Sequence, residues 1–189
     1  RLERDKRVRA DGNDQYNEMI GDFSHYVDDP YVEPGFTRDP IFEEVEVVVI
    51  GGGFGGMLAA ARLSEVGIHD VKIIEKGSGF GGTWYWNRYP GASCDIESYV
   101  YLPMLEETGF VPKQKYTDAP ETLEYCEELA TKFGLHDNAL MQTEVTATEW
   151  DEDACRWNVT TNRQDFIKAR FVVHSNGPLN RPKLPAIKG

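Results

Sequence analysis

The first strong pattern in the chain is a run of apolar, mostly β-branched residues at positions 45–50, interrupted only by Glu46. A short, nearly continuous apolar run is typical of a parallel strand that is buried on both faces. A glycine cluster follows, and residues 54–66 then predict a helix that ends at Gly67. Residues 71–75 predict a second strand. Strand, tight turn, helix and strand within about 30 residues predict a βαβ unit and therefore an α/β fold with a parallel sheet and a crossover helix.

The second half of the chain predicts one more helix and three more strands. Residues 118–133 predict a helix, because Asp118 and Glu121 fit a capping box and Gly134 follows its end. The spacing of its apolar residues predicts a core-facing stripe of Leu123, Cys126, Ala130 and Phe133. Residues 144–150, 156–160 and 170–175 predict strands, with a solvated turn at residues 151–153 between the first two. These strands indicate a small β-meander, and residues 77–103 indicate an ordered loop.

Residues 1–44 differ from the rest in charge and periodicity. The first nine residues carry five basic side chains, whereas residues 10–44 carry ten acidic side chains and a single base, Arg38. Prolines interrupt any regular pattern, since proline fixes its own φ and restricts the residue before it. We therefore predict an extended acidic N-terminal extension over residues 1–44, with one short helix near residues 13–26, and a separate domain over residues 45–189. Aromatic residues in the extension are expected to pack on a larger body: Phe23, Tyr26, Tyr31, Phe36 and Phe42.

Composition narrows the class of function. The 189 residues are 40% hydrophobic, and the net charge is -12. Such an acidic chain is a poor candidate for nucleic-acid or anionic-membrane binding, because both require a basic surface, and no apolar run approaches the roughly 18–20 residues of a membrane span. Cys94, Cys126 and Cys155 lie far apart, which favours reduced thiols and a cytoplasmic location. The four histidines are scattered, so no metal site is expected.

The glycine cluster carries the strongest local chemical signal. Gly51, Gly53 and Gly56 form a GxGxxG pattern, within which Phe54 and Gly55 also lie. In a dinucleotide site the first glycine permits the tight turn, the second lets the backbone approach the pyrophosphate, and the third lets the helix pack closely on the strand. The phosphates would lie at the helix N-terminus, and Glu75 would accept hydrogen bonds from the adenosine ribose. The alternative is a glycine-rich turn without a ligand, and the βαβ unit alone does not distinguish FAD from NAD.

The segment after the second strand favours FAD and identifies a family. A second glycine pair, Gly81 and Gly82, offers backbone N–H groups to the middle of a long cofactor soon after Glu75. Residues 81–98, GGTWYWNRYPGASCDIES, resemble the flavin loop of Baeyer–Villiger monooxygenases. Residues 169–185 resemble the strand and glycine turn that close the first FAD half in the same family, although Ser175-Asn176-Gly177 stands where Ala-Thr-Gly or Ala-Ser-Gly is more usual. The resemblance covers residues 45–189 and implies a Rossmann-like FAD-binding domain.

The resemblance also implies an activity. Such enzymes use FAD, NADPH and O₂ to convert a ketone into an ester or lactone through a peroxyflavin. The NADPH domain and the catalytic arginine of the family would lie beyond Gly189, so the chain is expected to be an N-terminal FAD-binding segment that needs the rest of the same polypeptide and is inactive alone. Two alternatives remain: a flavin monooxygenase that oxygenates nitrogen or sulfur, and a flavin-binding module without chemistry of its own. The ketone, the regioselectivity, the oligomeric state and the role of the extension are not defined by the sequence.

Carried over by position, the resemblance implies roles for individual residues. Asp95 is the catalytic candidate and would pair with the active-site arginine, the alternative being that it only caps the loop or contacts the flavin. Cys94 is expected to be a packed or solvent-facing thiol rather than a nucleophile, and Arg88 a structural donor within the loop. Trp84 and Trp86 are either cofactor walls or core. The residues expected near the flavin are Gly82, Thr83, Trp84, Tyr85 and Trp86. Those expected near the nicotinamide are Ser93, Cys94 and Asp95. Tyr101 and Val145 are expected to lie along the cofactor.

Overall fold

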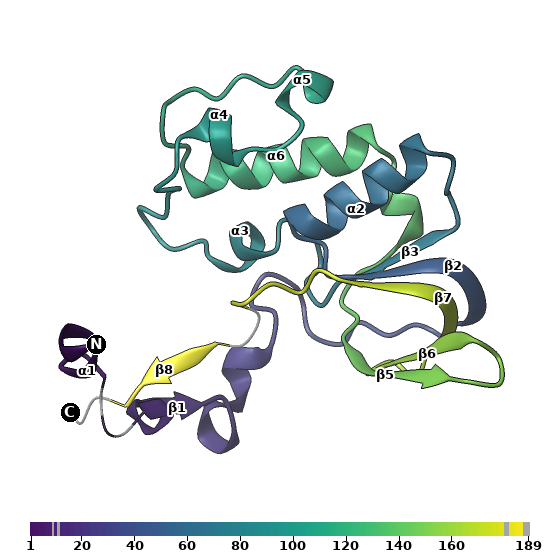
Figure 1. The fold of residues 1–189 in the computed structure, drawn as a ribbon, viewed down its shortest axis with the longest axis horizontal. Coiled ribbons are helices and arrows are strands. Elements are labelled where there is room, and N and C mark those ends of the chain that lie inside the picture. Colours follow the sequence, from purple (N-terminus) through teal and green to yellow (C-terminus); the bar gives the residue numbers. More distant parts are fainter. Residues whose placement is uncertain (9, 11, 180–181, 187–189) are drawn as a thin grey trace. The chain divides into compact units, whose positions relative to one another are not determined.

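The computed structural model describes residues 1–8, 10, 12–179 and 182–186. Two compact units are present, and Figure 1 shows the elements of both. One unit is the segment Tyr31–Gly177, and the other combines Arg1–Pro30 with Pro178–Gly189, as far as these are described. Residues 31–44 therefore belong to the same unit as the sheet. The domain boundary placed after residue 44 from the sequence stays a prediction.

A six-stranded sheet organises the unit Tyr31–Gly177, with the strand order β4-β3-β2-β7-β6-β5. Strands β4, β3, β2 and β7 are parallel, and β7, β6 and β5 form an antiparallel meander. This arrangement confirms the predicted α/β fold with a parallel sheet and a small meander. The strands are β2 (Phe42–Ile50), β3 (Val71–Ile74), β4 (Ala139–Leu140), β5 (Val145–Asp151), β6 (Arg156–Thr161) and β7 (Phe166–His174).

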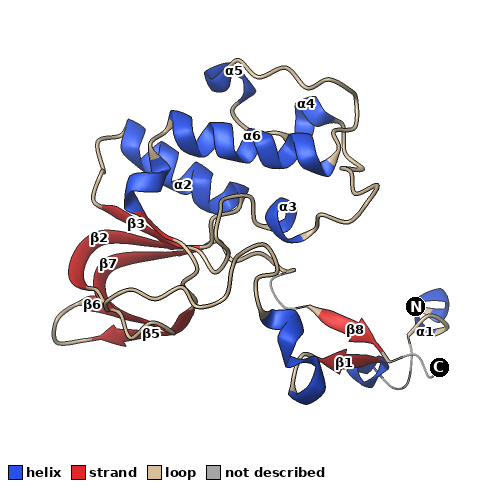
Figure 2. Cartoon of the chain, turned by 180° about the vertical axis from the view of Figure 1, so that it is seen from behind, coloured by secondary structure: helices blue, strands red, loops and turns tan. Residues whose placement is uncertain are grey.

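Two helices cover one face of the sheet. Helix α2 (Phe54–Glu65) connects β2 to β3 and ends before Gly67, whose φ is +86°, so the predicted βαβ unit and its terminating glycine are confirmed. Helix α6 (Ala119–Lys132) begins where expected, because the Asp118 side chain accepts a hydrogen bond from the Glu121 N–H at 3.0 Å. A 3₁₀ turn, η3 (Leu135–Asn138), follows it. Figure 2 shows α2 between the sheet and α6.

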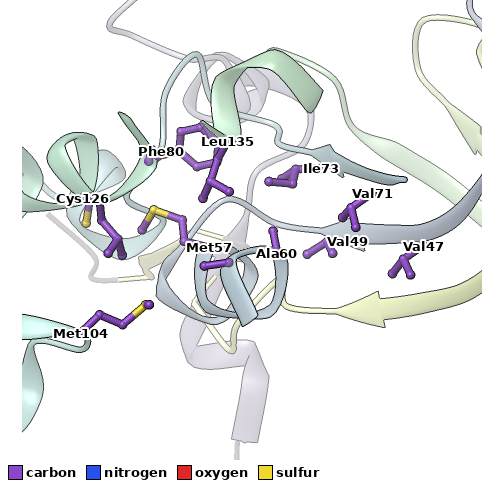
Figure 3. Close-up of a cluster of buried hydrophobic side chains, with 13 residues drawn as sticks. Val47, Val49, Met57, Ala60, Val71, Ile73, Phe80, Met104, Cys126 and Leu135 are labelled. Atoms are coloured by element: carbon purple, nitrogen blue, oxygen red, sulfur yellow. The ribbon is translucent and has the colours of Figure 1, made fainter. Parts of the chain in front are cut away.

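The main core lies between the sheet and these helices, as Figure 3 shows. Of the stripe predicted for α6, Cys126 and Ala130 are buried, whereas Leu123 and Phe133 are only half-buried. Tyr125 and Leu129 are fully buried in addition, because α6 is covered over a wider face than a narrow stripe provides. A second cluster of buried side chains comes from the strands alone and consists of Val45, Val48, Ile74, Val159, Ile167 and Ala169.

The long connection between β3 and α6 is an ordered loop that contains three single-turn helices. These are α3 (Thr83–Trp86), α4 (Ser98–Tyr101) and α5 (Leu105–Thr108). The sequence predicted that this loop is ordered, but it did not predict the helical turns, because four-residue helices are too short to show a periodicity.

The second unit corrects one expectation. A single helix was expected near residues 13–26, but the chain forms a 3₁₀ turn η1 (Gly12–Gln15), strand β1 (Tyr16–Glu18) and a second 3₁₀ turn η2 (Gly21–Val27). The helix prediction is wrong because β1 pairs antiparallel with β8 (Lys183–Pro185), from the far end of the chain. A short helix, α1 (Leu2–Asp5), precedes these elements. Within the predicted turn-and-exit segment 169–185, residues 180 and 181 lie outside the described residues.

Residues 31–41 are attached to the sheet unit by a buried ion pair. The guanidinium of Arg38 contacts both carboxylate oxygens of Asp165 at 2.6 Å, and the Asp165 side chain is fully buried. The same carboxylate accepts hydrogen bonds from the Ile41 N–H and the Thr161 hydroxyl. Burial alone would raise the pKa of Asp165, but these hydrogen bonds outweigh it and hold the pKa at about 2.

The aromatic residues of the extension behave in two ways. Tyr31 packs against the Tyr85 ring, and the Phe36 ring lies under the Arg163 guanidinium at 4.5 Å, so these two pack on the larger body as expected. Phe42 is 74% exposed although it begins β2, and Tyr26 is 51% exposed. For Phe42 the packing expectation is wrong, and for Tyr26, which belongs to the other unit, it stays a prediction.

Candidate functional site

The candidate site lies where the parallel strands end. The Gly51 N–H donates to the Ile74 carbonyl at 2.9 Å, and the Ser175 N–H donates to the Ile50 carbonyl at 2.8 Å, so the ends of β2, β3 and β7 meet at the glycine cluster. Open α/β sheets bind ligands at the carboxyl ends of their strands. The turn between β2 and α2 is therefore placed where a ligand is expected.

Two of the three motif glycines are required by the fold itself. Gly51 has a φ of +107°, and a Cβ there would lie 2.6 Å from the Ser175 carbonyl oxygen. A Cβ on Gly56 would lie 1.8 Å from the Gly51 carbonyl oxygen, so only glycine allows α2 to start so close to the turn. These are the roles that the sequence predicted for the first and third glycines.

Gly53 is different, because the fold does not require glycine at this position. Its φ of -76° and ψ of -175° are open to any residue. A Cβ would meet the Gly82 Cα at 3.4 Å, which is an ordinary contact. The glycine leaves the backbone bare at the start of α2, next to the second glycine pair, where the Gly81 N–H donates to the Gly52 carbonyl at 2.9 Å.

The N-terminus of α2 can attract an anion. Gly53 is the N-cap, no side chain caps the helix, and no acidic residue lies in its first turn. The first N–H groups of a helix have no partner within it, and the helix dipole adds positive potential there. Phe54, Gly55 and Gly56 supply these N–H groups beside the bare backbone of Gly53, and this combination is typical of phosphate-binding helix ends.

Glu75 joins the two glycine-rich segments. Its side chain is buried, and its carboxylate accepts hydrogen bonds from the Gly52 N–H at 2.5 Å and the Gly77 N–H at 2.7 Å. The residue lies just after β3, where the sequence placed a ribose-binding acid. The ribose contact itself stays a prediction, and the observed contacts give Glu75 a part in shaping the turn.

The aromatic run of α3 divides into packed and accessible residues. Trp84 and Tyr85 are buried, whereas Trp86 is half-buried and Thr83 is exposed. The Trp84 indole N–H donates to the Tyr101 hydroxyl at 2.8 Å, and Trp84 packs with Ala92, Cys94 and Ala119. Of the two tryptophans, Trp84 is thus a core residue in the described chain, and Trp86 is the one with an accessible side.

The segment after α3 places Ser93 and Asp95 at the surface and Cys94 inside. The Cys94 thiol is buried and accepts a hydrogen bond from the Ile96 N–H at 3.4 Å, so it is packed rather than solvent-facing. Among the described residues, no hydrogen bond or ion pair holds the Asp95 carboxylate, which is exposed. Asp95 is therefore available to a partner.

Tyr101 contacts the start of α2, and Val145 follows a segment that is bonded to Glu75. The ring of Tyr101 packs edge-on against Phe54, the first residue of α2, and burial raises the pKa of the Tyr101 hydroxyl although the Trp84 hydrogen bond opposes this. Val145 begins β5 and is half-buried. The residues just before it are tied to Glu75, because the Thr143 N–H donates to the Glu75 carbonyl at 2.9 Å.

Sequence reasoning assigned no role at this site to several residues that shape it. Ser175 closes the turn against Gly51 and Gly55, and Tyr31 donates a hydrogen bond to the Trp86 carbonyl at 3.2 Å. The ion pair of Arg38 and Asp165 was also missed, although the only base among ten acids in residues 10–44 was a visible signal. Arg88 is a structural donor as expected, since its Nε donates to the Tyr85 carbonyl at 2.8 Å.

Comparison with known proteins is consistent with this geometry. The NAD(P)-binding Rossmann-like domain family matches residues 49–108. Neopentalenolactone D synthase of Streptomyces avermitilis is 50% identical over the whole chain, which covers 32% of that protein. A Baeyer–Villiger monooxygenase of Streptomyces coelicolor is 47% identical over the whole chain, which covers 31% of it. The chain is homologous to the N-terminal part of Baeyer–Villiger monooxygenases.

Solved structures agree with this assignment. The polycyclic ketone monooxygenase of Thermothelomyces thermophila has a TM-score of 0.88 and 36% identity, and the match covers all of this chain and 33% of that one. A structure of OTEMO in complex with FAD and NADP has a TM-score of 0.71 and 34% identity, over 77% of this chain and 28% of that one. The predicted resemblance to Baeyer–Villiger monooxygenases is confirmed, and the chain spans about a third of the length of the curated relatives it matches.

No helix among the described residues is both long and apolar enough to cross a membrane. In the same part of the chain, no group of three or more His, Cys, Asp or Glu side chains is placed to hold a metal ion.

Proposed function

We propose that this chain binds FAD as the N-terminal part of an NADPH-dependent Baeyer–Villiger monooxygenase. The observation that carries the proposal is Gly53, a glycine that the fold does not require, at the uncapped start of α2. A pyrophosphate needs such a bare backbone and such N–H groups. The residues present therefore fit the adenosine diphosphate half of FAD, and the OTEMO complex with FAD and NADP supports the same choice of cofactors.

Each segment of the site has a role in this proposal. The turn from Gly51 to Gly56 would hold the pyrophosphate, and Glu75 would bind the ribose while it keeps the turn in shape. Thr83 and Trp86 are the accessible residues of α3 and would face the flavin, as would the backbone of Gly82. Trp84 and Tyr85 would support them from the core, and Tyr101 and Val145 would flank the cofactor. Ser93, Cys94 and Asp95 would lie on the nicotinamide side.

The reaction proposed for the intact protein is the oxygenation of a ketone. When bound, FAD would supply the transfer of reducing equivalents from NADPH to O₂, so that one oxygen atom enters the bond beside a ketone carbonyl and the other leaves as water. Ketone, O₂, NADPH and a proton thus give an ester or lactone, NADP⁺ and water. The homologous proteins named as Baeyer–Villiger monooxygenases favour this reaction over oxygenation of nitrogen or sulfur. The cytoplasmic location expected from the sequence stays a prediction.

The proposal is tested on the intact protein with FAD, NADPH and a cyclic ketone. Titration of FAD into the apo-protein should show saturable binding, and the loaded protein should convert cyclohexanone or a larger cyclic ketone into its lactone with one NADPH consumed per product. Binding of FAD without any oxygenation of ketones would restrict the chain to a flavin-binding module. Product formed only from amines or sulfides would replace the ketone assignment.

Gly53→Ala is the sharpest test of the phosphate loop. The backbone at Gly53 accepts a side chain, so the variant should fold normally, but the methyl group would occupy the approach of the pyrophosphate. We expect FAD affinity to fall by roughly 10-fold or more, about 1.4 kcal/mol. The measurement is a fluorescence titration of apo-protein, with circular dichroism to confirm the fold. Unchanged affinity would remove Gly53 from the phosphate site.

Asp95→Ala tests the proposed catalytic role. The Asp95 carboxylate is exposed and would hold and tune an arginine of the intact protein that stabilises developing negative charge. We expect kcat for ketone oxygenation to fall by roughly tenfold, about 1.4 kcal/mol, with FAD retained. Glu97→Gln is the matched control, because Glu97 is exposed nearby and pairs only with Lys115, at 2.8 Å, among the described residues. Equal turnover in both variants would exclude a catalytic role for Asp95.

A further inference from the structure

Arg88 contacts two tyrosine rings that come from different parts of the chain and that also touch each other. Its guanidinium carbon is 3.8 Å from the centre of the Tyr31 ring and 4.5 Å from the centre of the Tyr85 ring. The Arg88 Nε also donates to the Tyr85 carbonyl, and the Tyr31 hydroxyl donates to the Trp86 carbonyl. The two rings meet edge-on, at 89° and with their centres 5.7 Å apart, so the guanidinium is in cation–π range of both. Together these contacts, called the clamp below, hold Tyr31 against the turn that contains α3.

The clamp continues from Tyr85 into the glycine-rich loop that follows β3. The Tyr85 ring lies so close to Gly77 that a Cβ there would be 2.8 Å from the ring. The Tyr85 hydroxyl also contacts the Ser78 hydroxyl at 2.6 Å and accepts from the Ser78 N–H at 3.2 Å. Tyr85 thus supports the backbone of residues 77 and 78.

That backbone holds Glu75 in turn. The Gly77 N–H donates to one carboxylate oxygen of Glu75, and the other oxygen accepts from the Gly52 N–H. Contacts therefore run without interruption from Tyr31 through Arg88, Tyr85 and Gly77 to Glu75 and the turn before α2. The residues at the end of this path are those proposed to bind the adenosine half of FAD.

Tyr31 is held at the start of the path by its own segment. Residues 36–41 are fixed to the turn between β6 and β7, because Arg38 pairs with the buried Asp165 and Arg163 donates to the Phe36 carbonyl at 3.0 Å. Tyr31 is only five residues before Phe36, so its ring is presented to Arg88 from an anchored segment rather than from a free end.

From these contacts we propose that Tyr31 and Arg88 are positioning residues for the FAD site. This inference rests on the proposed function, because the two residues act through Tyr85 and Glu75 on the turns that would hold the cofactor. Each exposed cation–π contact is weak, so the effect on the FAD dissociation constant is a few-fold for each ring. Neither residue touches the reacting atoms in this account.

The test compares FAD affinity across a matched set of variants of the intact protein. Tyr31→Ala should raise the FAD dissociation constant about fivefold, and Arg88→Ala, which loses both rings, about tenfold. Tyr31→Phe should stay within about twofold of wild type, because the stacked ring is kept and only one hydrogen bond is lost. The control is Tyr26→Ala, an exposed tyrosine in the same part of the chain. FAD titration and the FAD release rate are the readouts, and thermal melting of the apo-protein monitors the fold.

The outcomes separate this inference from the proposed function. Weaker FAD binding in Tyr31→Ala and Arg88→Ala, with rescue by Tyr31→Phe and no effect of Tyr26→Ala, supports it. Wild-type affinity in the first two variants overturns it and leaves the proposed function intact, whereas a wild-type protein that does not bind FAD overturns both. If Tyr31→Ala does not fold, Tyr31→Leu takes its place, since it keeps apolar bulk but no ring, and the same loss is expected.

Discussion

Gly56→Ala should destabilise the protein by about 3 kcal/mol and remove FAD binding. The added Cβ would lie 1.8 Å from the Gly51 carbonyl oxygen, a backbone atom that cannot rotate away. Relief of this clash requires either α2 to move off the sheet or the turn before it to open. The start of α2 and the core contacts of Met57 would both be lost. Urea unfolding followed by circular dichroism measures the stability, and FAD titration measures the site.

The matched control is the neighbouring Gly55→Ala. A Cβ on Gly55 would meet the Ser175 side chain at 3.6 Å, an ordinary contact, and alanine favours a helix over glycine by about 1 kcal/mol. Gly55→Ala should therefore be neutral or slightly stabilising. Equal stability of the two variants would contradict the close approach of α2 to the turn. The comparison also separates a general effect of side chains in this helix from the specific clash.

Asp165→Asn should cost about 3–5 kcal/mol of folding stability. The Asp165 carboxylate is buried and satisfies Arg38 on both oxygens as well as Thr161 and Ile41. An amide presents one acceptor and cannot pair with a guanidinium charge, so Arg38 would be left partly buried without its counter-charge. Chemical unfolding of both proteins at neutral pH measures the difference. Glu44→Gln is the control, since Glu44 pairs with Arg156 at the surface, where such pairs contribute at most about 1 kcal/mol.

The same ion pair predicts how stability depends on pH. The pKa of Asp165 is about 2 in the folded protein, below its ordinary value of 3.8. A carboxyl whose pKa is lowered by folding stabilises the protein at pH values above the unfolded pKa, and this contribution is lost as the pH falls toward the folded pKa. The stability difference between wild type and Asp165→Asn should thus be constant above about pH 5 and shrink between pH 4 and 2. A difference that does not change over this range would contradict the lowered pKa.

The βαβ unit was predictable because its signals are local. Apolar runs mark β2 and β3, and Gly51, Gly56 and Gly67 mark the ends of α2. The start of α6 was also predictable, since Asp118 and Glu121 are three residues apart and their contact is an N-cap hydrogen bond. In each case the residues that decide the structure are close in the sequence.

The rest depends on contacts between distant residues. β1 forms within residues 13–26, where a helix was expected, because it pairs with β8. This partner is distant in the sequence, since Asn17 lies opposite Leu184, about 167 positions later. Arg38 and Asp165 are 127 residues apart, and no local pattern pairs them. Trp84 and Cys94 pack with Ala119, which lies outside the flavin loop. The sequence of the loop alone therefore could not decide whether Trp84 is a core residue or lines the cofactor.

The position of β7 between β2 and β6 has a consequence for how the chain folds. β2 pairs with β3, which follows it closely in the sequence, but its other neighbour is the distant β7, with Phe42 opposite Phe166. This edge of β2 therefore stays open until residues 166–174 have been synthesised. Non-local strand pairing of this kind folds slowly, and an open apolar edge is prone to aggregate in the meantime. Chains cut before β7 would keep that edge open, so we expect them to aggregate.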